Sequence, residues 1–322
     1  MEYRRLGNSD LRVSAVGLGC TSFGDRVWHE AALDEAASAA IVHEALDQGI
    51  TLFDTAESYG KGLSEEYLGR ALGARRSDVI IATKFAHRIS LSEPGIGGSW
   101  DYILQAVEGS LRRLGTDYID LYQMHMPDVE TPIEETLEAL DSLVQRGVVR
   151  WIGSSNFSGE QIAAAARVSL ERNFQPFVSA QNEWSLLRRD VEADVVPSAV
   201  QNGVGVIPYF PLAEGFLTGK YQRGMTIPAN ARLTHLQEDQ AAAALSDARF
   251  DALEALTNFA EARGHTILEL ALAWLASQPA VASVIAGATT PAQVRSNAAA
   301  TLSWQLDGDA MAAVDRILAS IS

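Results

Sequence analysis

The sequence predicts an α/β fold, namely a parallel (β/α)8 barrel of the TIM-barrel class. Short β-branched or apolar runs alternate with helix-compatible segments along nearly the whole chain, and polar residues stand where several of these runs end. Alternating strands and helices favour a parallel sheet, and barrels of this class carry their chemistry where the strands end. We therefore expect a single domain over residues 1–322, with its functional site at one rim.

The first predicted elements are a short hairpin and the first barrel strand. The turn-rich residues 6–11 separate two short segments, as in a small hairpin that precedes the repeat. A strand over residues 16–18 then leads to a helix over residues 34–48, and Gly49 is its predicted stop.

Seven further strand candidates follow at regular intervals. Helices are predicted over residues 63–71, 101–114 and 133–145 from apolar residues that recur on one face. Thr131 and Glu134 predict a capping box at the start of the third of these helices. The longest irregular stretch, residues 215–238, is interpreted as a lid or binding loop, with disorder as the alternative. The strands are predicted at residues 52–54, 79–83, 119–125, 151–154, 178–181, 204–208 and 284–286.

Composition narrows the class of protein. A net charge of -16 argues against a nucleic-acid partner, because phosphate binding needs clustered Lys and Arg. The single cysteine, Cys20, has no partner for a disulfide or a metal site and is predicted to be a buried small residue. The start of the chain lacks a hydrophobic signal region, so we expect a cytoplasmic protein.

One apolar stretch, residues 267–288, resembles a membrane span. Glu269, Gln278 and Pro279 interrupt it, whereas a spanning helix needs about 20 predominantly apolar residues. A core helix that ends near Gln278, followed by a buried strand, explains the stretch better, and no membrane partner is expected.

Four polar residues stand at or just beyond the ends of three successive predicted strands: Asp54, Tyr59, Lys84 and His125. Tyr59 can act as a general acid if a neighbouring Lys84 ammonium lowers its pKa from about 10. Asp54 would supply the counter-charge that a buried lysine needs. A neutral His125 could donate a hydrogen bond to a substrate carbonyl oxygen. The alternative for each residue alone is a structural role, in an ordinary ion pair or as a packed side chain. The prediction of a catalytic site therefore rests on the combination of the four.

The strings Asp54-Thr-Ala-Glu-Ser-Tyr59-Gly, Thr83-Lys84-Phe85 and Gln123-Met-His125 resemble the aldo-keto reductase family. The resemblance extends over nearly the whole chain and includes residues 17–24, 151–157 and 284–288. It implies a (β/α)8 barrel, a cofactor that is usually NADPH, and a catalytic tetrad formed by Asp54, Tyr59, Lys84 and His125. By this resemblance, hydride passes from nicotinamide C4 to a carbonyl carbon while Tyr59 protonates the oxygen, and the reaction is reversible.

The same resemblance implies cofactor contacts. Ser155, Asn156 and Gln181 match residues that hold the carboxamide, and Tyr209 matches the aromatic residue that stacks on the nicotinamide ring. The segment from residue 287 resembles the adenosine-binding segment, but it begins Gly-Ala-Thr where many NADPH-using relatives carry a cation. Because a 2′-phosphate is recognised through charged hydrogen bonds, NADPH leads and NADH is the second candidate. The further implied contacts are Leu212, Gly215, Leu217 and Lys220 for the pyrophosphate loop and Gly287, Gln293 and Asn297 for the adenosine segment.

A Rossmann fold is the weaker alternative. The fragment from Gly17 to Ser22 has serine where the dinucleotide fingerprint needs a third glycine or alanine, and no acidic ribose ligand follows in the required context.

The substrate is indicated only by class. Phe23, Trp28, Phe85 and Trp100 stand after the first and third strands, where they either line a carbonyl substrate or pack a loop against the barrel. We expect a neutral aldehyde, ketone or sugar-derived carbonyl. A cofactor-sensing regulatory subunit, resembling channel-associated members of the superfamily, and a barrel hydrolase or lyase are the alternatives. The sequence leaves the oligomeric state open.

Overall fold

Eight parallel strands form one sheet in the order β10-β3-β4-β5-β6-β7-β8-β9. The computed structural model describes residues 1–25, 32–87, 97–226 and 245–321. Trp28 and residues 227–238 of the predicted lid therefore lie outside the described residues. The barrel strands are β3 (Val16–Gly19), β4 (Leu52–Asp54), β5 (Ile80–Phe85), β6 (Ile119–Met124), β7 (Val149–Ser155), β8 (Phe177–Gln181), β9 (Gly205–Val206) and β10 (Val284–Gly287).

The two ends of this sheet meet. Val206 of β9 bridges Val281, just before β10, in parallel. Its amide donates to the Ala280 carbonyl at 2.8 Å, and its carbonyl accepts from the Ala282 amide at 2.9 Å. Further along, the Ile285 amide donates to the Pro208 carbonyl at 2.9 Å. These bonds join β9 to β10, so the sheet is a (β/α)8 barrel as the sequence predicts.

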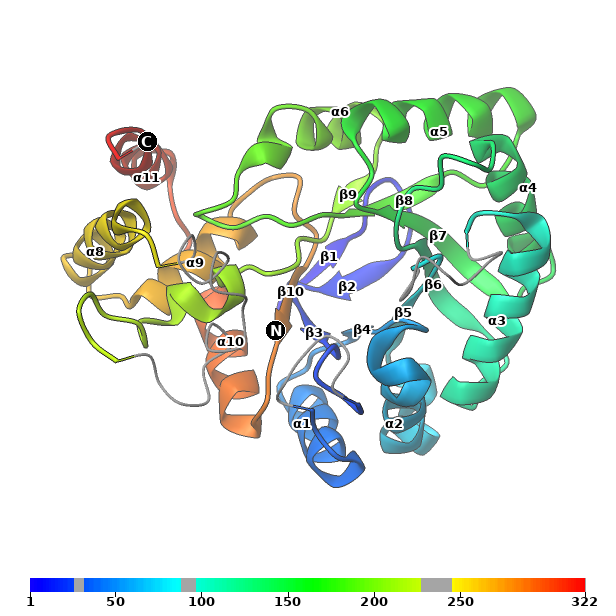
Figure 1. Cartoon of the computed structure of the whole chain (residues 1–322), viewed down its shortest axis with the longest axis horizontal. Helices are drawn as coiled ribbons and strands as arrows, with labels where there is room; N and C mark the ends of the chain where they lie inside the picture. The colour runs from blue at the N-terminus through cyan, green and yellow to red at the C-terminus, as the bar shows by residue number, and fades with distance from the viewer. Residues whose placement is uncertain (26–31, 88–96, 227–244, 322) are drawn as a thin grey trace.

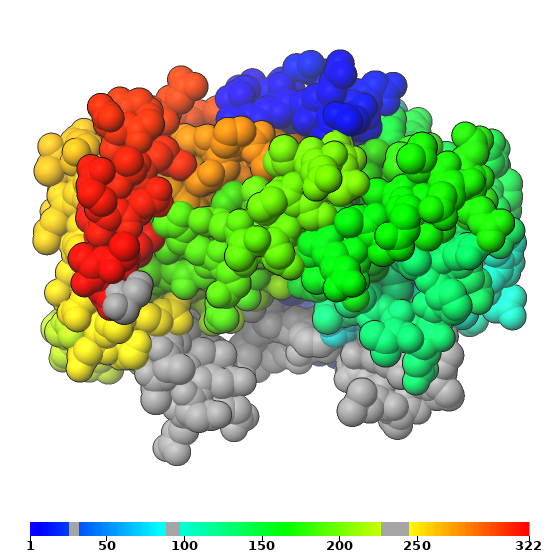
Figure 2. All heavy atoms as spheres, turned by 90° about the horizontal axis from the view of Figure 1, so that it is seen from above, coloured from blue at the N-terminus to red at the C-terminus, as the bar shows by residue number. Residues whose placement is uncertain are grey.

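A two-stranded hairpin covers one end of the barrel. Strands β1 (Tyr3–Arg5) and β2 (Arg12–Ser14) pair in antiparallel fashion, as predicted. The hairpin lies across the centre of the strand ring in Figure 1 and forms a cap over one end of the molecule in Figure 2. Its apolar residues join side chains from inside the barrel in a separate core cluster, so this end is filled. The cluster comprises Leu6, Leu11, Val13, Leu52, Ala82, Leu121, Val178, Ile207, Ala282 and Ile285.

A second, larger core lies between the sheet and the surrounding helices. α9 is buried from Leu270 to its end, and its Trp274 packs edge-on against Trp184 at 5.8 Å between ring centres. No described helix is long and apolar enough to cross a membrane. The described helices are α1 (Glu35–Asp47), α2 (Leu63–Leu72), α3 (Trp100–Leu114), α4 (Ile133–Gln145), α5 (Gly159–Arg172), α6 (Val195–Gln201), α8 (Asp247–Glu261), α9 (Ile267–Ala276), α10 (Pro291–Ser303) and α11 (Gly308–Ala319).

The predicted capping box of α4 is wrong. The helix begins at Ile133 with Pro132 as its N-cap, and no side chain caps it. The Thr131 hydroxyl instead donates to the Asp128 carboxylate at 2.7 Å. A proline at the capping position displaces the threonine by one residue, so its oxygen cannot reach the amide it would cap. The predicted stop of the first helix is confirmed. Gly49 follows α1 and its C-cap, and it has a φ of 76°.

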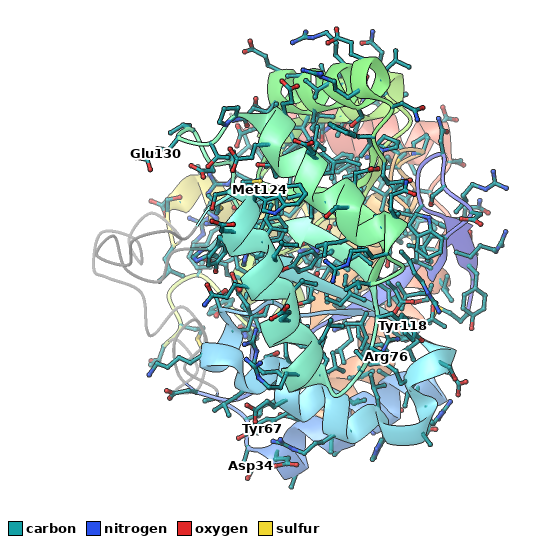
Figure 3. The ribbon with its side chains drawn as sticks, turned by 90° about the vertical axis from the view of Figure 1, so that its right-hand side faces the viewer. Asp34, Tyr67, Arg76, Tyr118, Met124 and Glu130 are labelled. Carbon is teal, nitrogen blue, oxygen red and sulfur yellow. The ribbon has the colours of Figure 1, made fainter. Side chains whose placement is uncertain are left out.

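All barrel strands point the same way, which separates the two ends of the molecule. In Figure 3, Tyr118, just before β6, lies toward the hairpin, whereas Met124 at the end of β6 and Glu130 beyond it lie toward the opposite side. The carboxyl ends of the strands therefore meet at the rim away from the hairpin, where a barrel carries its chemistry.

Candidate active site

The four predicted catalytic residues converge at the carboxyl rim. Asp54 ends β4, Lys84 lies near the end of β5, and His125 follows β6 directly. The His125 amide donates to the Phe85 carbonyl at 2.8 Å, which continues the β5–β6 ladder by one residue. Tyr59 begins a 3-10 turn, Tyr59–Gly62, so its hydroxyl reaches back to the strand ends. We call these residues the candidate tetrad.

Lys84 and Asp54 form a buried ion pair. The Lys84 Nζ is 2.7 Å from an Asp54 carboxylate oxygen, and these side chains are 1% and 4% exposed. The ammonium also donates to the Thr55 carbonyl at 2.9 Å. The other Asp54 oxygen accepts from the Gln181 amide at 2.8 Å, so both carboxylate oxygens are occupied. Burial alone lowers the pKa of Lys84, yet Asp54 and Tyr59 raise it above its ordinary value, so the lysine is charged.

Tyr59 lies at the edge of this pair. Its hydroxyl is 3.5 Å from the Lys84 Nζ, which is long for a hydrogen bond. Burial raises the pKa of Tyr59 above its ordinary value, and the Lys84 ammonium lowers it by less. Lys84 thus lowers the pKa of Tyr59, as predicted. The prediction that the pKa ends below its ordinary value is wrong, because the cost of removing the phenolate from water exceeds its stabilisation by the ammonium. In this state Tyr59 is a protonated phenol that can donate.

His125 is neutral. Burial lowers the pKa of its imidazole well below the ordinary value, and the neighbouring Lys84 and His87 lower it further. Its ring meets the Tyr59 ring edge-on at 5.7 Å between centres. A neutral imidazole and a protonated phenol beside each other provide two donors toward one substrate oxygen.

The predicted nicotinamide residues stand beside the tetrad on the next strands. Asn156 has a left-handed φ of 61°, and its side chain donates to the His125 carbonyl at 2.9 Å. The Tyr209 hydroxyl donates to the Asn156 side-chain oxygen at 2.8 Å. The Ser155 hydroxyl donates to the Gln181 carbonyl at 2.9 Å. The structure therefore brings Ser155, Asn156, Gln181 and Tyr209 into one network, in which the Gln181 side chain is occupied by Asp54.

The predicted pyrophosphate loop follows β9 and includes a 3-10 segment, Ala213–Thr218. Gly215 has a φ of 93°, and a Cβ placed on it would lie 3.0 Å from the Lys220 Nζ, so glycine lets the lysine approach the backbone. Leu212 is half-buried. Leu217 is fully buried, and its side chain packs in the larger core cluster. Its side chain is therefore not exposed to a cofactor in this structure.

The predicted adenosine segment lies at the start of α10. The Gln293 side-chain oxygen accepts from the Thr289 amide at 2.7 Å, and the Asn297 amide donates to the Gly287 carbonyl at 3.2 Å. Both side chains thus fold the loop between β10 and α10. Arg295 in the same helix is ion-paired with Glu44 of α1.

The aromatic residues predicted to line a substrate differ in burial. Phe23 and Phe85 are both 0% exposed, and Phe85 packs against Tyr122 at 4.7 Å between ring centres. Both rings are taken up by core packing, so neither side chain is exposed toward a substrate in this structure. Trp100 opens α3, and Trp28 lies outside the described residues.

Two polar residues at the rim were missed by the sequence analysis. Glu57 lies two residues before Tyr59, and His87 lies three residues after Lys84 with its ring 4.5 Å from that of His125. A signal for Glu57 was present, since it is a carboxylate inside the string that supplies Asp54 and Tyr59. His87 had no such signal, because only the turn after β5 brings it to His125.

Comparison with known proteins decides the family. A model described as "Aldo/keto reductase family" matches residues 15–319. The chain belongs to the aldo-keto reductase family. Among curated aldo-keto reductase relatives, it is 35% identical over 324 residues to "Aldo-keto reductase YhdN" of Bacillus subtilis, covering 99% of this chain and 94% of the relative. It is 36% identical over 306 residues to "Probable voltage-gated potassium channel subunit beta" of Arabidopsis thaliana, covering 92% and 90%.

Solved aldo-keto reductase structures agree with the fold. The glycerol dehydrogenase AKR11B4 from Gluconobacter oxydans superposes with a TM-score of 0.83 at 33% identity, covering 99% of this chain and 95% of that one. The holo form of aldo-keto reductase AKR11C1 from Bacillus halodurans gives 0.78 at 33% identity, with 98% and 96% covered. This aldo-keto reductase is an NAD(P)H-dependent oxidoreductase that acts on carbonyl groups and their alcohols.

Proposed function

We propose that the chain reduces an aldehyde or ketone to an alcohol with NADPH, with Tyr59 as the general acid. One observation carries the proposal: the buried Lys84–Asp54 pair ends beside a protonated Tyr59 hydroxyl and a neutral His125 ring at one rim of the barrel. An arrangement with two neutral donors and a nearby fixed positive charge matches the needs of a carbonyl that becomes an alkoxide.

Each residue of the candidate tetrad then has a role. His125 and Tyr59 orient the carbonyl oxygen through hydrogen bonds, and Tyr59 passes its proton to that oxygen as negative charge develops. Lys84 stabilises the resulting phenolate, and Asp54 holds Lys84 charged and in place. The Gln181 amide fixes Asp54 from the opposite side. In the reverse reaction the Tyr59 phenolate accepts the proton.

The residues at the rim fit a nicotinamide cofactor. The left-handed Asn156 and the half-buried Tyr209 present an amide and a ring beside His125, and Lys220 beside Gly215 offers a cation for a phosphate. The cofactor supplies the hydride when bound. Ser155, Asn156 and Gln181 would hold its carboxamide end, Tyr209 its ring, Leu212, Gly215 and Lys220 its pyrophosphate, and Gly287, Gln293 and Asn297 its adenosine end.

NADPH is the proposed cofactor and NADH is the second candidate. In the described part of the adenosine segment the arginine, Arg295, is engaged with Glu44, so recognition of a 2′-phosphate would require that pair to open. We propose a neutral aldehyde, ketone or sugar-derived carbonyl as substrate, and the cytoplasm as the compartment. L-glyceraldehyde 3-phosphate reductase of Escherichia coli, 35% identical over 333 residues, widens the panel to a phosphorylated aldehyde.

The test is oxidation of NADPH and NADH against a panel of carbonyl compounds, with Tyr59→Phe in parallel. We expect the variant to bind cofactor as tightly as the parent, since the phenyl ring stays, but to lose on the order of 100-fold or more in kcat, which is typical for loss of a general acid. Tyr3→Phe is the matched control, because the Tyr3 hydroxyl lies in the hairpin at the other end of the barrel, where it donates to the Gly49 carbonyl at 3.1 Å. Full turnover by Tyr59→Phe would refute the assignment.

A regulatory subunit is the second candidate function. The similarity to a protein named as a potassium channel subunit beta favours it. Under this alternative the protein binds cofactor tightly and turns over slowly. Co-purification with a larger membrane partner, together with negligible turnover on the whole panel, would support it over the reductase.

A further inference from the structure

Glu57 makes contacts that neither the tetrad nor the cofactor residues account for. Its side-chain oxygen Oε1 accepts two hydrogen bonds, from the Tyr102 hydroxyl at 2.7 Å and from the Ala86 amide at 3.0 Å. Its own amide donates to the Lys84 carbonyl at 3.1 Å. The loop after β4 is therefore tied through one residue to the end of β5 and to α3.

The Ala86 end of this tie is an unusual backbone position. Ala86 has a φ of 66°, a left-handed conformation that residues with a Cβ rarely adopt. The following residue, His87, lies with its ring 4.5 Å from that of His125. The bond from the Ala86 amide to Glu57 thus holds the turn that delivers His87 to the candidate tetrad.

We propose that Glu57 is a positioning residue of the active site, which fixes the left-handed turn at Ala86 and so keeps the His87 ring against His125. The inference rests on the proposed function for its catalytic consequence, but the geometry stands without it. A displaced His87 would change both the packing and the electrostatic surroundings of His125, because His87 is among the groups that keep His125 neutral.

Protonation of Glu57 should loosen this tie. Burial is the main reason that the pKa of Glu57 is raised to about 7, so its charge changes near neutral pH. A carboxylate is a stronger acceptor than a carboxylic acid, so the bond to Ala86 is strongest above this pH. Among the described residues, the charged and titratable groups that interact with Glu57 are Glu65 on α2, Tyr102 and Arg113 on α3, and Tyr122 on β6.

Three variants separate positioning from bulk packing. Glu57→Gln keeps an acceptor oxygen of the same shape without the charge, whereas Glu57→Ala removes the acceptor. We expect Glu57→Ala to lose on the order of 10- to 100-fold in kcat/KM with cofactor affinity unchanged, as for a modest misplacement of an active-site group. Ala86→Gly in the Glu57→Ala background should restore part of that loss, because glycine adopts the left-handed turn without help. Glu160→Gln, an exposed carboxylate in α5, is the control.

The pH profile gives the second measurement. In the parent, kcat/KM should fall roughly fivefold as pH decreases through about 7, the effect of one hydrogen bond losing its charged acceptor. Glu57→Gln should lack this step and should stay near the low-pH level of the parent. A step that survives in Glu57→Gln, or a double variant no better than Glu57→Ala, would overturn the proposal.

A measurement without turnover keeps this test independent of the proposed reaction. Nuclear Overhauser contacts between the His87 and His125 ring protons, assigned with His87→Asn, should be present in the parent and in Glu57→Gln and absent in Glu57→Ala. Retained contacts in Glu57→Ala would overturn the positioning role. A parent that shows the contacts but reduces no carbonyl would instead refute the proposed function and leave the positioning role supported.

Discussion

Replacing Glu57 with Gln should change how stability depends on pH. The folded protein raises the pKa of this carboxyl from 4.5 to about 7, so the folded state binds the proton more tightly than the unfolded state does. Below about pH 4.5 the Glu57 carboxyl is protonated in both states, so it does not lower the free energy of unfolding. As pH rises toward about 7 the folded state loses stability, and above about 7 the full penalty is present. At about 1.36 kcal/mol for each unit of difference between the folded and unfolded pKa values, ionisation of Glu57 lowers the free energy of unfolding by at most about 3.4 kcal/mol.

Glu57→Gln removes this titration while it keeps an acceptor for the Ala86 amide and the Tyr102 hydroxyl. Relative to the parent, the variant should therefore gain about 2.5 kcal/mol in unfolding free energy between pH 5 and pH 8. Equilibrium urea unfolding at both pH values, followed by tryptophan fluorescence without cofactor, measures this difference. Glu160→Gln should follow the parent. If the gain between the two pH values is under about 0.5 kcal/mol, the burial argument for Glu57 is refuted.

Two further predictions concern buried contacts. Lys84→Met leaves the Asp54 carboxylate buried without its cation, so we expect a loss of about 3–5 kcal/mol in unfolding free energy, measured by urea titration, and an unchanged stability would contradict the ion pair. Gly69→Ala places a Cβ 2.2 Å from the Leu114 carbonyl oxygen and should cost about 1–3 kcal/mol. Gly308→Ala, where a Cβ meets nothing within 4 Å, is its control and should stay within about 0.5 kcal/mol.

The barrel and the grouping of the tetrad were predictable because both follow from local pattern. Apolar runs mark strands, and parallel strands carry their carboxyl ends to one rim, so Asp54, Lys84 and His125 had to come together once the topology was known. The bounds of β4 and α4 agree with the predicted ranges. Strand β9 is shorter than predicted, because only Gly205–Val206 pairs regularly before the chain turns toward Pro208.

The remaining errors come from burial, which a sequence does not display. Phe23 and Phe85 look like pocket residues by position, but each ring is taken into the core. The pKa of Tyr59 depends on a competition between desolvation and Lys84, and only the distances decide it. The contact between Glu57 and Ala86 needs a left-handed turn at an alanine, for which no residue preference gives a signal.

The capped end of the barrel also has a consequence for synthesis of the chain. Leu6, Leu11 and Val13 are translated long before Ala282 and Ile285, with which they pack. The inner core cannot be completed until the final strand has emerged, and the hairpin must wait with its apolar side uncovered. The need for protection by a chaperone therefore lasts until residues 282–285 have been translated.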